Sequence, residues 1–545
     1  MLIRLKGGRV IDPVNTRDAV GDVYIENGRI VAKPANGGKL DETYDVSGKI
    51  VMAGGVDIHS HIAGSNITAA RLLMPELPAL AAKGGVEIPA SPASWGAYAT
   101  GLRYAQMGYT TVIEPALQPT HAIESQTELA QIPIIDVGAL GILGNDDFSL
   151  GLLRDGASQS QVNDYVAWTL AHAKCIGLKV INAGGAEAFK FNARTFDLDD
   201  EVPAYGVTSR SIVQALQAAV TELGVPHPVH VHCNNLGVAG NFETAIATMA
   251  AAEGRPMHLA HIQFYGYGDE GDRGFSSGAP QLVEALAAHR NVSVDIGQVL
   301  FGQTVTMSGD ILRQFDGRRA ASPNKWVLYQ GEGNGTGVVP YNYRAKNFVN
   351  AVQWAIGLEI VLLADDLWRV LFSTDHPNGA LFTRYPEIIH LLMDRDERAR
   401  RLEDVPQAAR EASNLAGLSR ELTLSEIAIV TRGAPARVLG LTDRGHLGPG
   451  AVGDIAVYTE QANKTEMFSC AHLVFKDGEL VVRDGEIACV TWGRAWHVAP
   501  DFDPAIERRI DGFYDRYYGV DPECFGVPSD IAGRPQRFAE LPCLN

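Results

Sequence analysis

The chain has 545 residues, of which 46% are hydrophobic, and it carries a formal net charge of −18 with no concentrated basic run. This length exceeds one small core and suits a barrel of about 250 residues or more with an accessory domain. The negative net charge argues against nucleic acid and anionic membranes as partners. The sequence has no long uncharged apolar stretch and no signal-peptide pattern, so we expect a cytoplasmic protein.

Short strands with tight turns are predicted at both ends of the chain. Residues 1–50 alternate apolar and polar side chains, with turns predicted at Gly7-Gly8, Asn27-Gly28 and Gly37-Gly38. The same pattern returns within 431–499, so we expect the two segments to complete one small β-sandwich domain. The tail, 500–545, contains tyrosines and prolines and is a candidate for contact with a neighbouring subunit.

Between these segments, residues 51–430 alternate apolar strand-like runs with helical patterns, which is typical of an α/β fold built as a TIM-like (β/α)8 barrel. The strand-like runs are 110–113, 132–137, 177–181, 228–232, 257–262, 292–296 and 370–374. One helix is predicted over 211–223, capped by Thr208 or Ser209 and ended by Gly224. A doubly wound open sheet is the alternative, but no Gly-x-Gly-x-x-Gly motif supports dinucleotide binding.

The first chemical signal is His59-Ser60-His61, which follows an apolar, glycine-bounded run. Residues two apart on a strand face the same side, so both imidazoles can reach one metal ion. A catalytic zinc ion usually needs three protein ligands, so the pair alone is not sufficient. The alternative is a structural pair that is hydrogen-bonded at a strand end. The six cysteines form no Cys-x-x-Cys, so neither a disulfide framework nor a cysteine zinc site is indicated.

Further candidate ligands follow on later predicted strands. Lys179 faces the interior of an apolar strand, where a charged amine is costly unless it is paired or neutralised. It is either an ion-paired lysine or a carbamate formed with CO2, whose two oxygens could bridge two metal ions. His230 and His232 repeat the spacing of the first pair, and one can be a ligand while the other supports it.

The last candidates lie near the ends of two further strands. His258 and His261 are three residues apart, so on a strand only one of them is expected to face the barrel interior. Asp375 precedes a turn-forming sequence, where an isolated aspartate is ordinarily a turn or helix cap. In strand order, however, the chain offers His-x-His, Lys, His, His and Asp at the barrel end where active sites occur. Their joint occurrence favours a metal site.

These residues resemble the amidohydrolase superfamily in its binuclear form. The resemblance narrows to the A components of formylmethanofuran dehydrogenase and of the bacterial formyltransferase/hydrolase complex. The segments that carry it include Gly-Gly-Val-Asp-Ile-His-Ser-His, His-Val-His-Cys-Asn-Asn and Thr-Asp-His-Pro-Asn-Gly, and they are 54–64, 103–111, 230–237, 258–264, 297–302 and 374–379. The resemblance implies a metal-dependent hydrolase barrel with a small β domain built from both chain ends.

The resemblance also implies roles for the candidate residues. One zinc ion would be held by His59 and His61, and the other by His232 and His261. Carboxylated Lys179 would bridge the two ions. Asp375 would be the last ligand and would also move the proton. Asn234 and Asn235 are substrate-binding candidates. His230 and His258 would support the ligands from behind. Whether one or two ions bind stays open.

The implied reaction is hydrolysis of the N-formyl amide of formylmethanofuran or formylmethylofuran to formate and the free amine coenzyme, in tetrahydromethanopterin-linked formaldehyde oxidation. The implied partners are the other subunits of a formyltransferase/hydrolase complex. The excess of arginine over lysine favours the bacterial member over an archaeal dehydrogenase component that condenses formate with methanofuran. The alternatives are another amidohydrolase that acts on cyclic amides and a non-catalytic scaffold.

Overall fold

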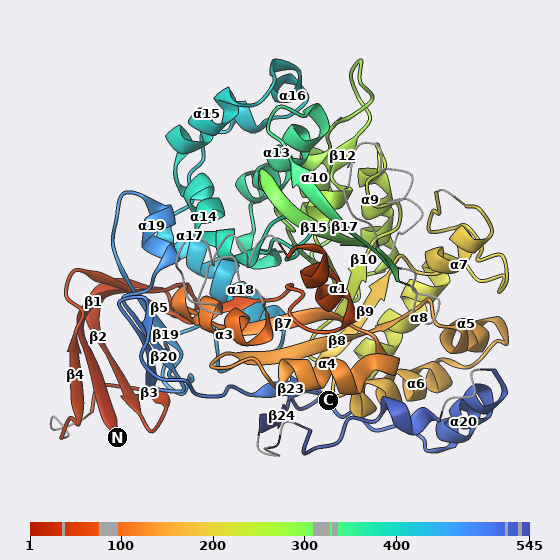
Figure 1. Ribbon diagram of the computed structural model, residues 1–545, viewed down its shortest axis with the longest axis horizontal. Helices are drawn as coiled ribbons and strands as arrows, with labels where there is room; N and C mark the ends of the chain where they lie inside the picture. Colours follow the sequence, from red (N-terminus) through yellow and green to blue (C-terminus); the bar gives the residue numbers. More distant parts are fainter. Residues whose placement is uncertain are drawn as a thin grey trace.

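The computed structural model describes residues 1–34, 39–75, 96–193, 195–308, 327–329, 336–517, 521–531, 533 and 537–544. A β domain lies at one side of a larger barrel whose helices lie on the outside (Figure 1). The predicted turn at Gly7-Gly8 is wrong, because both glycines lie within one strand, Leu2–Asp12, at an irregularity in its pairing. The predicted turn at Gly37-Gly38 falls outside the described residues. Within them, none of the helices combines the length and the apolar character that crossing a membrane requires.

Strands from both ends of the chain share one sheet, which has nine strands within the described residues. They are β1 Leu2–Asp12, β2 Arg17–Glu26, β3 Arg29–Val31, β4 Glu42–Asp45, β5 Lys49–Ala53, β19 Ile455–Thr459, β20 Leu473–Lys476, β21 Glu479–Arg483 and β22 Glu486–Ile487. β19 runs antiparallel to β5, with Ile455 opposite Ala53, and this pairing joins the two ends. β1 pairs with β4 near its start and with β5 further along, so the sheet divides into two parts along β1. Apolar side chains of these strands form a core that is separate from the core of the barrel.

The predicted turn at Asn27-Gly28 connects β2 to β3. Asn27 has φ 50° and Gly28 has φ 80°, so both central residues adopt the left-handed conformation that a type I′ hairpin turn requires. Glycine and asparagine tolerate this conformation better than other residues. The turn sets the register of the hairpin, in which Tyr24 lies opposite Val31.

Eight parallel strands of the described chain form the barrel and neighbour one another in chain order. They are β6 Gly55–Asp57, β7 Tyr109–Leu117, β8 Asp136–Leu143, β9 Gly177–Ile181, β10 Val229–His232, β11 Met257–Leu259, β14 Val292–Asp295 and β18 Val370–Leu371. A parallel backbone bridge between Ser60 and His376 connects the ends of the first and last strands. The predicted TIM-like barrel is confirmed.

One predicted strand is displaced along the chain. The run 132–137 was expected to be a strand, but β8 spans Asp136–Leu143. The isoleucines before β8 pack against the C-terminal segment, where the backbone N–H of Ile134 donates to the carbonyl of Thr491 over 2.8 Å. Gly138 and Gly141 interrupt the true strand, and glycine weakens the strand signal in a sequence.

Helices on the outside of the barrel cover its strands (Figure 1). They are α3 Ala97–Gln106, α4 Ala122–Leu129, α5 Asp147–Arg154, α6 Gln159–His172, α7 Gly185–Lys190, α8 Ser209–Glu222, α9 Phe242–Ala251, α10 Ala279–Ala288, α13 Phe348–Leu363 and α14 Tyr385–Met393. In α8, the Thr208 side chain accepts from the Ser211 N–H, and Gly224 follows with φ 64°. The predicted cap and stop residues are therefore confirmed, although the helix spans 209–222 rather than 211–223. Helices that lead back to the β domain are α15 Arg395–Glu403, α16 Gln407–Glu411, α17 Leu424–Ala428, α18 Ala434–Val438 and α19 Lys464–Ser469.

A small layer covers the mouth of the barrel at the carboxyl ends of its strands. It contains helix α1 Ser65–Leu73 and an antiparallel sheet of β15 Gly302–Ser308, β16 Val327–Tyr329 and β17 Thr336–Tyr343. Ile67 of α1 packs with Val305 of β15 and Val338 of β17 in a separate apolar cluster. Figure 1 shows α1 beside β15 and β17, and we call these three elements the cover.

The C-terminal segment lies against the barrel of its own chain. β23 Ala495–His497 pairs in parallel with β8, and β24 Phe538–Glu540 pairs with β23. Helix α20 Ala505–Tyr517 contacts α6. Contact of this segment with a neighbouring subunit stays a prediction.

Candidate metal centre

Polar side chains on four neighbouring strands occupy one row inside the barrel. Lys179 lies opposite His230, His230 opposite His258, and His258 opposite Ser293. In a parallel sheet, residues in register point to the same face, so these four side chains share the barrel interior. Each of them is buried. His232, two residues beyond His230, belongs to the same face and lies one step nearer the mouth.

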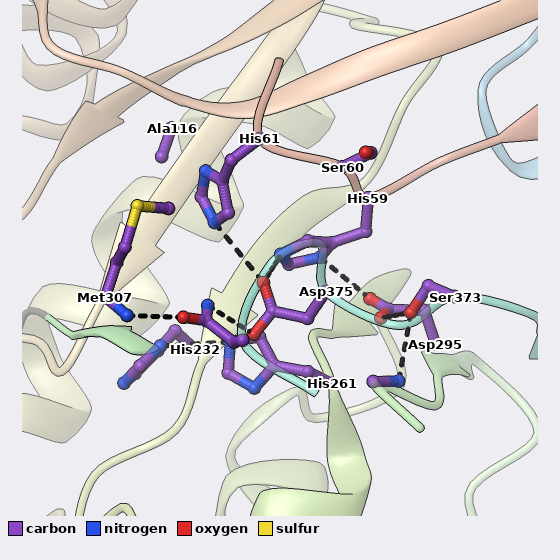
Figure 2. Close-up of polar contacts among 12 residues, drawn as sticks. His59, Ser60, His61, Ala116, His232, His261, Asp295, Met307, Ser373 and Asp375 are labelled. Atoms are coloured by element: carbon purple, nitrogen blue, oxygen red, sulfur yellow. Dashed lines mark hydrogen bonds and ion pairs between the residues drawn. The ribbon is translucent and has the colours of Figure 1, made fainter. Parts of the chain in front are cut away.

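His59, His61 and Asp375 meet above this row (Figure 2). Asp375 Oδ1 lies 3.1 Å from His59 Nε2 and 3.3 Å from His61 Nε2. The three ligand atoms are close enough together to hold one metal ion. Asp375 Oδ2 accepts a 2.8 Å hydrogen bond from Asn378, which keeps Oδ1 directed at the two imidazoles.

The pairing pattern of these atoms fits a cation. His59 Nε2 and Asp375 Oδ1 are both buried without a hydrogen-bond partner among the described residues, although they lie 3.1 Å apart. Buried polar atoms without partners are costly in folded proteins and call for an explanation. A metal ion between these atoms would satisfy both of them, and imidazole nitrogen with carboxylate oxygen is a zinc donor set.

Carboxylates behind the two histidines fix their orientation. His59 Nδ1 lies 3.1 Å from Asp295, and His61 Nδ1 donates to Glu114 over 2.9 Å. A histidine that binds a metal ordinarily gives its other ring N–H to such a carboxylate, which turns the remaining nitrogen to the metal. In both residues this remaining nitrogen is the Nε2 that faces Asp375.

The same contacts set the protonation of His61. Burial lowers the pKa of His61, but the nearby charges of Glu114 and Asp375 outweigh burial and raise it to about 9. For Asp375, burial raises the pKa, whereas His261 and His59 hold it well below its ordinary value. The carboxylate is therefore ionised, while His61 gains a proton whenever no metal ion competes for its lone pair.

His232 and His261 form a second pair close to the first. His232 Nδ1 lies 3.1 Å from His261 Nε2, and the His59 and His261 ring centres are 5.2 Å apart. The ring of Tyr265 stacks against His261. His261 Nδ1 is buried without a hydrogen-bond partner within the described residues. The structure thus brings four of the predicted ligand histidines to one place.

The expectation that only one of His258 and His261 faces the interior is wrong. β11 ends at Leu259, and His261 has φ 33°, so the chain leaves strand geometry between the two histidines. His258 Nε2 contacts Asp295 over 3.1 Å, while His261 contacts His232. Asp375 also has a positive φ, 49°. Such strained backbone in non-glycine residues is concentrated at functional sites.

Lys179 is buried in the row below, with 2% of its surface exposed. Burial lowers the pKa of its amine to about 8, against the opposing charges of Asp295 and Asp375. Its amine has no hydrogen bond or ion pair to any residue that the structure describes. Lys476 shows the contrast, because it is equally buried but pairs with carboxylates, and its pKa is raised.

The two asparagines predicted to bind substrate make structural contacts. Asn234 donates to Ser209 over 2.8 Å, and Asn235 donates to Asp197 over 2.6 Å and to Thr244 over 3.2 Å. Asn235 also borders a surface pocket of about 390 Å³ between the 195–199 segment and α9. Within the described residues, no hydrogen bond joins either amide to the histidine cluster. A substrate-binding role for them stays a prediction.

Several residues of the site were not identified from the sequence. The carboxylates Glu114 and Asp295 orient ligand histidines, Asn378 holds Asp375, and Ser373 donates to Asp295 over 2.5 Å. A signal was present for two of them. Asp295 ends β14, in Val-Ser-Val-Asp, and Glu114 follows the apolar run Thr-Val-Ile in the second half of β7, at the barrel end where active sites occur.

The amidohydrolase family model matches residues 42–488 of the chain. The A component of the formyltransferase/hydrolase complex Fhc of Methylorubrum extorquens is 49% identical over 533 residues, 97% of each chain. Protein FwdA of Methanocaldococcus jannaschii is 36% identical over 555 residues, again 97% of each chain. A chain in the crystal structure of FhcABCD from Methylorubrum extorquens with methylofuran has 48% identity and a TM-score of 0.95, with 100% of both chains covered. The chain, with its barrel and its converging histidines, therefore belongs to the amidohydrolase family.

Proposed function

We propose that this chain hydrolyses the N-formyl amide of formylmethylofuran, or of the related formylmethanofuran, to formate and the free amine coenzyme. It acts as the hydrolase component of a cytoplasmic formyltransferase/hydrolase complex in tetrahydromethanopterin-linked formaldehyde oxidation. The observation that carries the proposal is the 49% identity to the A component of Fhc over 97% of both chains. A solved complex that contains so similar a chain holds methylofuran, which supports the choice of coenzyme.

In this proposal the site holds zinc, with two ions the favoured number. His59, His61 and Asp375 hold one ion, which agrees with their converging atoms without partners. His232 and His261 hold the other, since both rings are buried and their nitrogens lie 3.1 Å apart. His230 and His258 support the ligands from the row below, through their contacts with His59 and Asp295 respectively.

Lys179 is proposed to bridge the ions as a carbamate. Carbamate formation needs the neutral amine, and burial lowers the pKa of Lys179 to about 8. A buried ammonium without an ion pair is costly, so reaction with CO2 replaces a poorly placed cation by an anion that metal ions can neutralise. Two carbamate oxygens then supply the negative charge that the histidine ligands lack.

The residues divide the chemistry of amide hydrolysis among them. When bound, metal ions of this type polarise a carbonyl oxygen and lower the pKa of water from 15.7 to about 7. Asp375 Oδ1 faces the ligand imidazoles and accepts the proton of the attacking water. As the C–N bond breaks, Asp375 passes this proton to the amine nitrogen, a general acid–base role that contributes about 100-fold to 10,000-fold. One water is consumed, and formate and the amine are released.

The proposed reaction needs two functions that other components of the complex must supply: transfer of the formyl group to the coenzyme and binding of the coenzyme tail. The formyl group must reach the coenzyme through a formyltransferase, which is proposed to be another component of the complex. The family's coenzyme carries an acidic tail, and a chain with net charge −18 is a poor surface for it, so a partner is proposed to hold that tail.

Formate release by the purified complex tests the proposal. The complex is stripped of metal by a chelator and then given zinc, with or without bicarbonate, before formylmethylofuran or a cyclic amide such as hydantoin is added. We expect formate only from formylmethylofuran, no turnover without zinc, and faster recovery when bicarbonate supplies the carbamate carbon. Preferred hydrolysis of hydantoin would instead favour the cyclic-amide alternative, and a complex without bound metal or turnover would favour the scaffold.

A further inference from the structure

A line of three buried imidazoles runs from a helix end at the base of the barrel to the ligand His59. His227 Nδ1 lies 3.1 Å from the carbonyl oxygen of Val438, the last residue of α18. His227 Nε2 lies 3.1 Å from His230 Nδ1, and His230 Nε2 lies 3.0 Å from His59 Nδ1. All three histidines are fully buried.

The carbonyl end of this line determines where the protons are. A carbonyl oxygen only accepts, so His227 Nδ1 carries the hydrogen that is donated to Val438. In a neutral imidazole the other nitrogen is then an acceptor. Burial, with the neighbouring His258 as a second cause, lowers the pKa of His227 to about 3, so the ring is neutral at working pH. His227 Nε2 therefore accepts, and His230 Nδ1 must donate to it.

The carboxylate end gives the same answer independently. Asp295 Oδ2 lies 3.1 Å from His59 Nδ1 but 3.6 Å from His230 Nε2, so the shorter contact belongs to His59. A carboxylate accepts, which places a hydrogen on His59 Nδ1. This hydrogen also faces His230 Nε2, which must then be an acceptor. Asp295 Oδ1 accepts from Ser373, and Oδ2 also lies 3.1 Å from His258 Nε2.

We propose that His227 and His230 are positioning residues that hold His59 in its Nδ1-protonated form, so that the Nε2 lone pair faces the metal position. The inference rests on the proposed role of His59 as a ligand. Without the acceptor on His227, His230 is free to move its hydrogen to Nε2 and compete with His59 for Asp295. His59 could then carry its hydrogen on Nε2, the nitrogen that must be bare for a metal ion.

Two substitutions separate this role from simple packing. His227→Leu fills the space but removes the acceptor, whereas His227→Gln keeps one donor for Val438 and one acceptor for His230. Val229→Ala is the control, because Val229 is buried on the same strand but makes no side-chain hydrogen bond. A packing role predicts that both His227 variants behave alike.

The test is nitrogen NMR of histidine-labelled, metal-free complex, combined with zinc affinity from chelator competition. In the unchanged protein we expect all three rings to carry hydrogen on Nδ1, and the reverse form in any of them would overturn the proposal even if a variant fails to fold. We expect His227→Leu to give mixed forms of His230, which loses its acceptor, and zinc binding weaker by about 10-fold to 100-fold. His227→Gln should restore both, and Val229→Ala should leave the His230 form unchanged.

Two further results would contradict the proposal. One is a single Nδ1-protonated His230 in His227→Leu, and the other is failure of His227→Gln to improve on His227→Leu. Neither readout uses the furan coenzyme. The outcome for His227 and His230 therefore does not depend on whether the complex hydrolyses formylmethylofuran. A failure of the proposed function would be seen separately, in the formate assay.

Discussion

Single carboxylates determine which ring nitrogen His59 and His61 turn toward Asp375. Glu114 accepts from the His61 ring and also from the backbone N–H groups of Ile62 and Ala63, at 2.6 and 3.0 Å. One side chain thus anchors both the imidazole and the loop that carries it. Because Glu114 is also the main group that raises the pKa of His61, it links orientation to protonation at this position.

Glu114→Gln tests this link. In the metal-free protein, His61 with a pKa of about 9 is protonated at pH 7.5, so zinc binding must release a proton and affinity rises with pH until about 9. The amide removes the charge, and the pKa of His61 moves toward its ordinary value near 6.5. We expect less proton release at pH 7.5, measured by calorimetry in buffers of different ionisation enthalpy, and zinc affinity lower by about 10-fold to 100-fold.

The raised pKa of His61 also makes the stability of the metal-free fold depend on pH. It stabilises the metal-free fold below the unfolded pKa near 6.5, and this contribution is lost as pH rises through about 9.

Glu128→Gln is the matched control for the proton-release measurement on Glu114→Gln, because Glu128 accepts from Gly64 in the same loop without touching His61. Unchanged proton release in Glu114→Gln would contradict the assignment.

At the scale of single residues, the sequence predicts which residues belong to the site better than it predicts which way their side chains point. The paired histidines, Lys179 and Asp375 carry a recognisable spacing, and the structure brings His59, His61 and Asp375 together. The inward position of both His258 and His261 was not predictable, because it depends on a left-handed residue after β11. Whether a chain leaves a strand at a non-glycine residue is set by tertiary contacts rather than by local propensity.

The cover couples one structural element to the site. The backbone N–H of Met307 in β15 donates to Asn378 Oδ1 over 2.5 Å, and Asn378 in turn holds Asp375 (Figure 2). The position of β15 therefore affects the direction of the Asp375 carboxylate. α1 packs on the same sheet through Ile67, which is fully buried.

Ile67→Ala tests whether the cover supports the site. The substitution leaves a cavity between α1 and the sheet and costs about 2 to 5 kcal/mol of local packing. We expect faster hydrogen exchange in α1 and β15, unchanged exchange in the barrel strands, and slower formate release. Leu72→Ala on the same helix is the control, since Leu72 is 76% exposed. Equal exchange in both variants would show that the cover is not held by this cluster.

Elements with strong local signals were predicted well, and those with mixed signals were not. The Asn27-Gly28 hairpin and the α8 helix have turn and cap residues that act through local geometry. β8 was displaced because its glycines weaken the strand pattern, while the stronger apolar run before it packs against a segment more than 300 residues away. Such long-range packing leaves no periodic pattern in the sequence.

At the scale of the whole molecule, a buried ionic cluster joins the barrel to the β domain. Asp136 at the start of β8 contacts Arg444 over 2.8 Å and Lys476 of β20 over 3.2 Å. The backbone N–H of Arg494, just before β23, also donates to Asp136 over 2.7 Å. One carboxylate therefore links barrel, β domain and C-terminal segment, and Asp454 shares Lys476 with it.

Asp136→Asn tests how strongly this cluster holds the molecule together. Burial raises the pKa of Asp136, but Lys476 and Arg444 outweigh burial and hold it below its ordinary value. Such a carboxylate stabilises the fold above its unfolded pKa near 3.9, and this contribution is lost as pH falls. We expect the variant to lose about 3 kcal/mol at pH 7, and we expect its stability to fall less than that of the unchanged chain when the pH drops below about 4, measured by urea unfolding at pH 7 and pH 3.

The exposed pair of Arg9 and Asp18 supplies the control for that measurement. Asp18→Asn should change stability by less than about 1 kcal/mol, because water screens the exposed charges. Equal effects of the two substitutions would contradict a cluster that joins the domains. The cluster itself could not be predicted from the sequence, since Asp136 lies 308 residues before Arg444 and the burial of both depends on how the two domains meet.

The most direct test of the proposed chemistry is formate release from formylmethylofuran by the assembled complex that carries Asp375→Asn. The amide keeps the size of the side chain and its contact with Asn378 but cannot take and return the proton. We predict that the complex remains assembled while formate release falls at least about 100-fold. Turnover at the rate of the unchanged complex would contradict the central claim that Asp375 moves the proton during hydrolysis of the formyl amide.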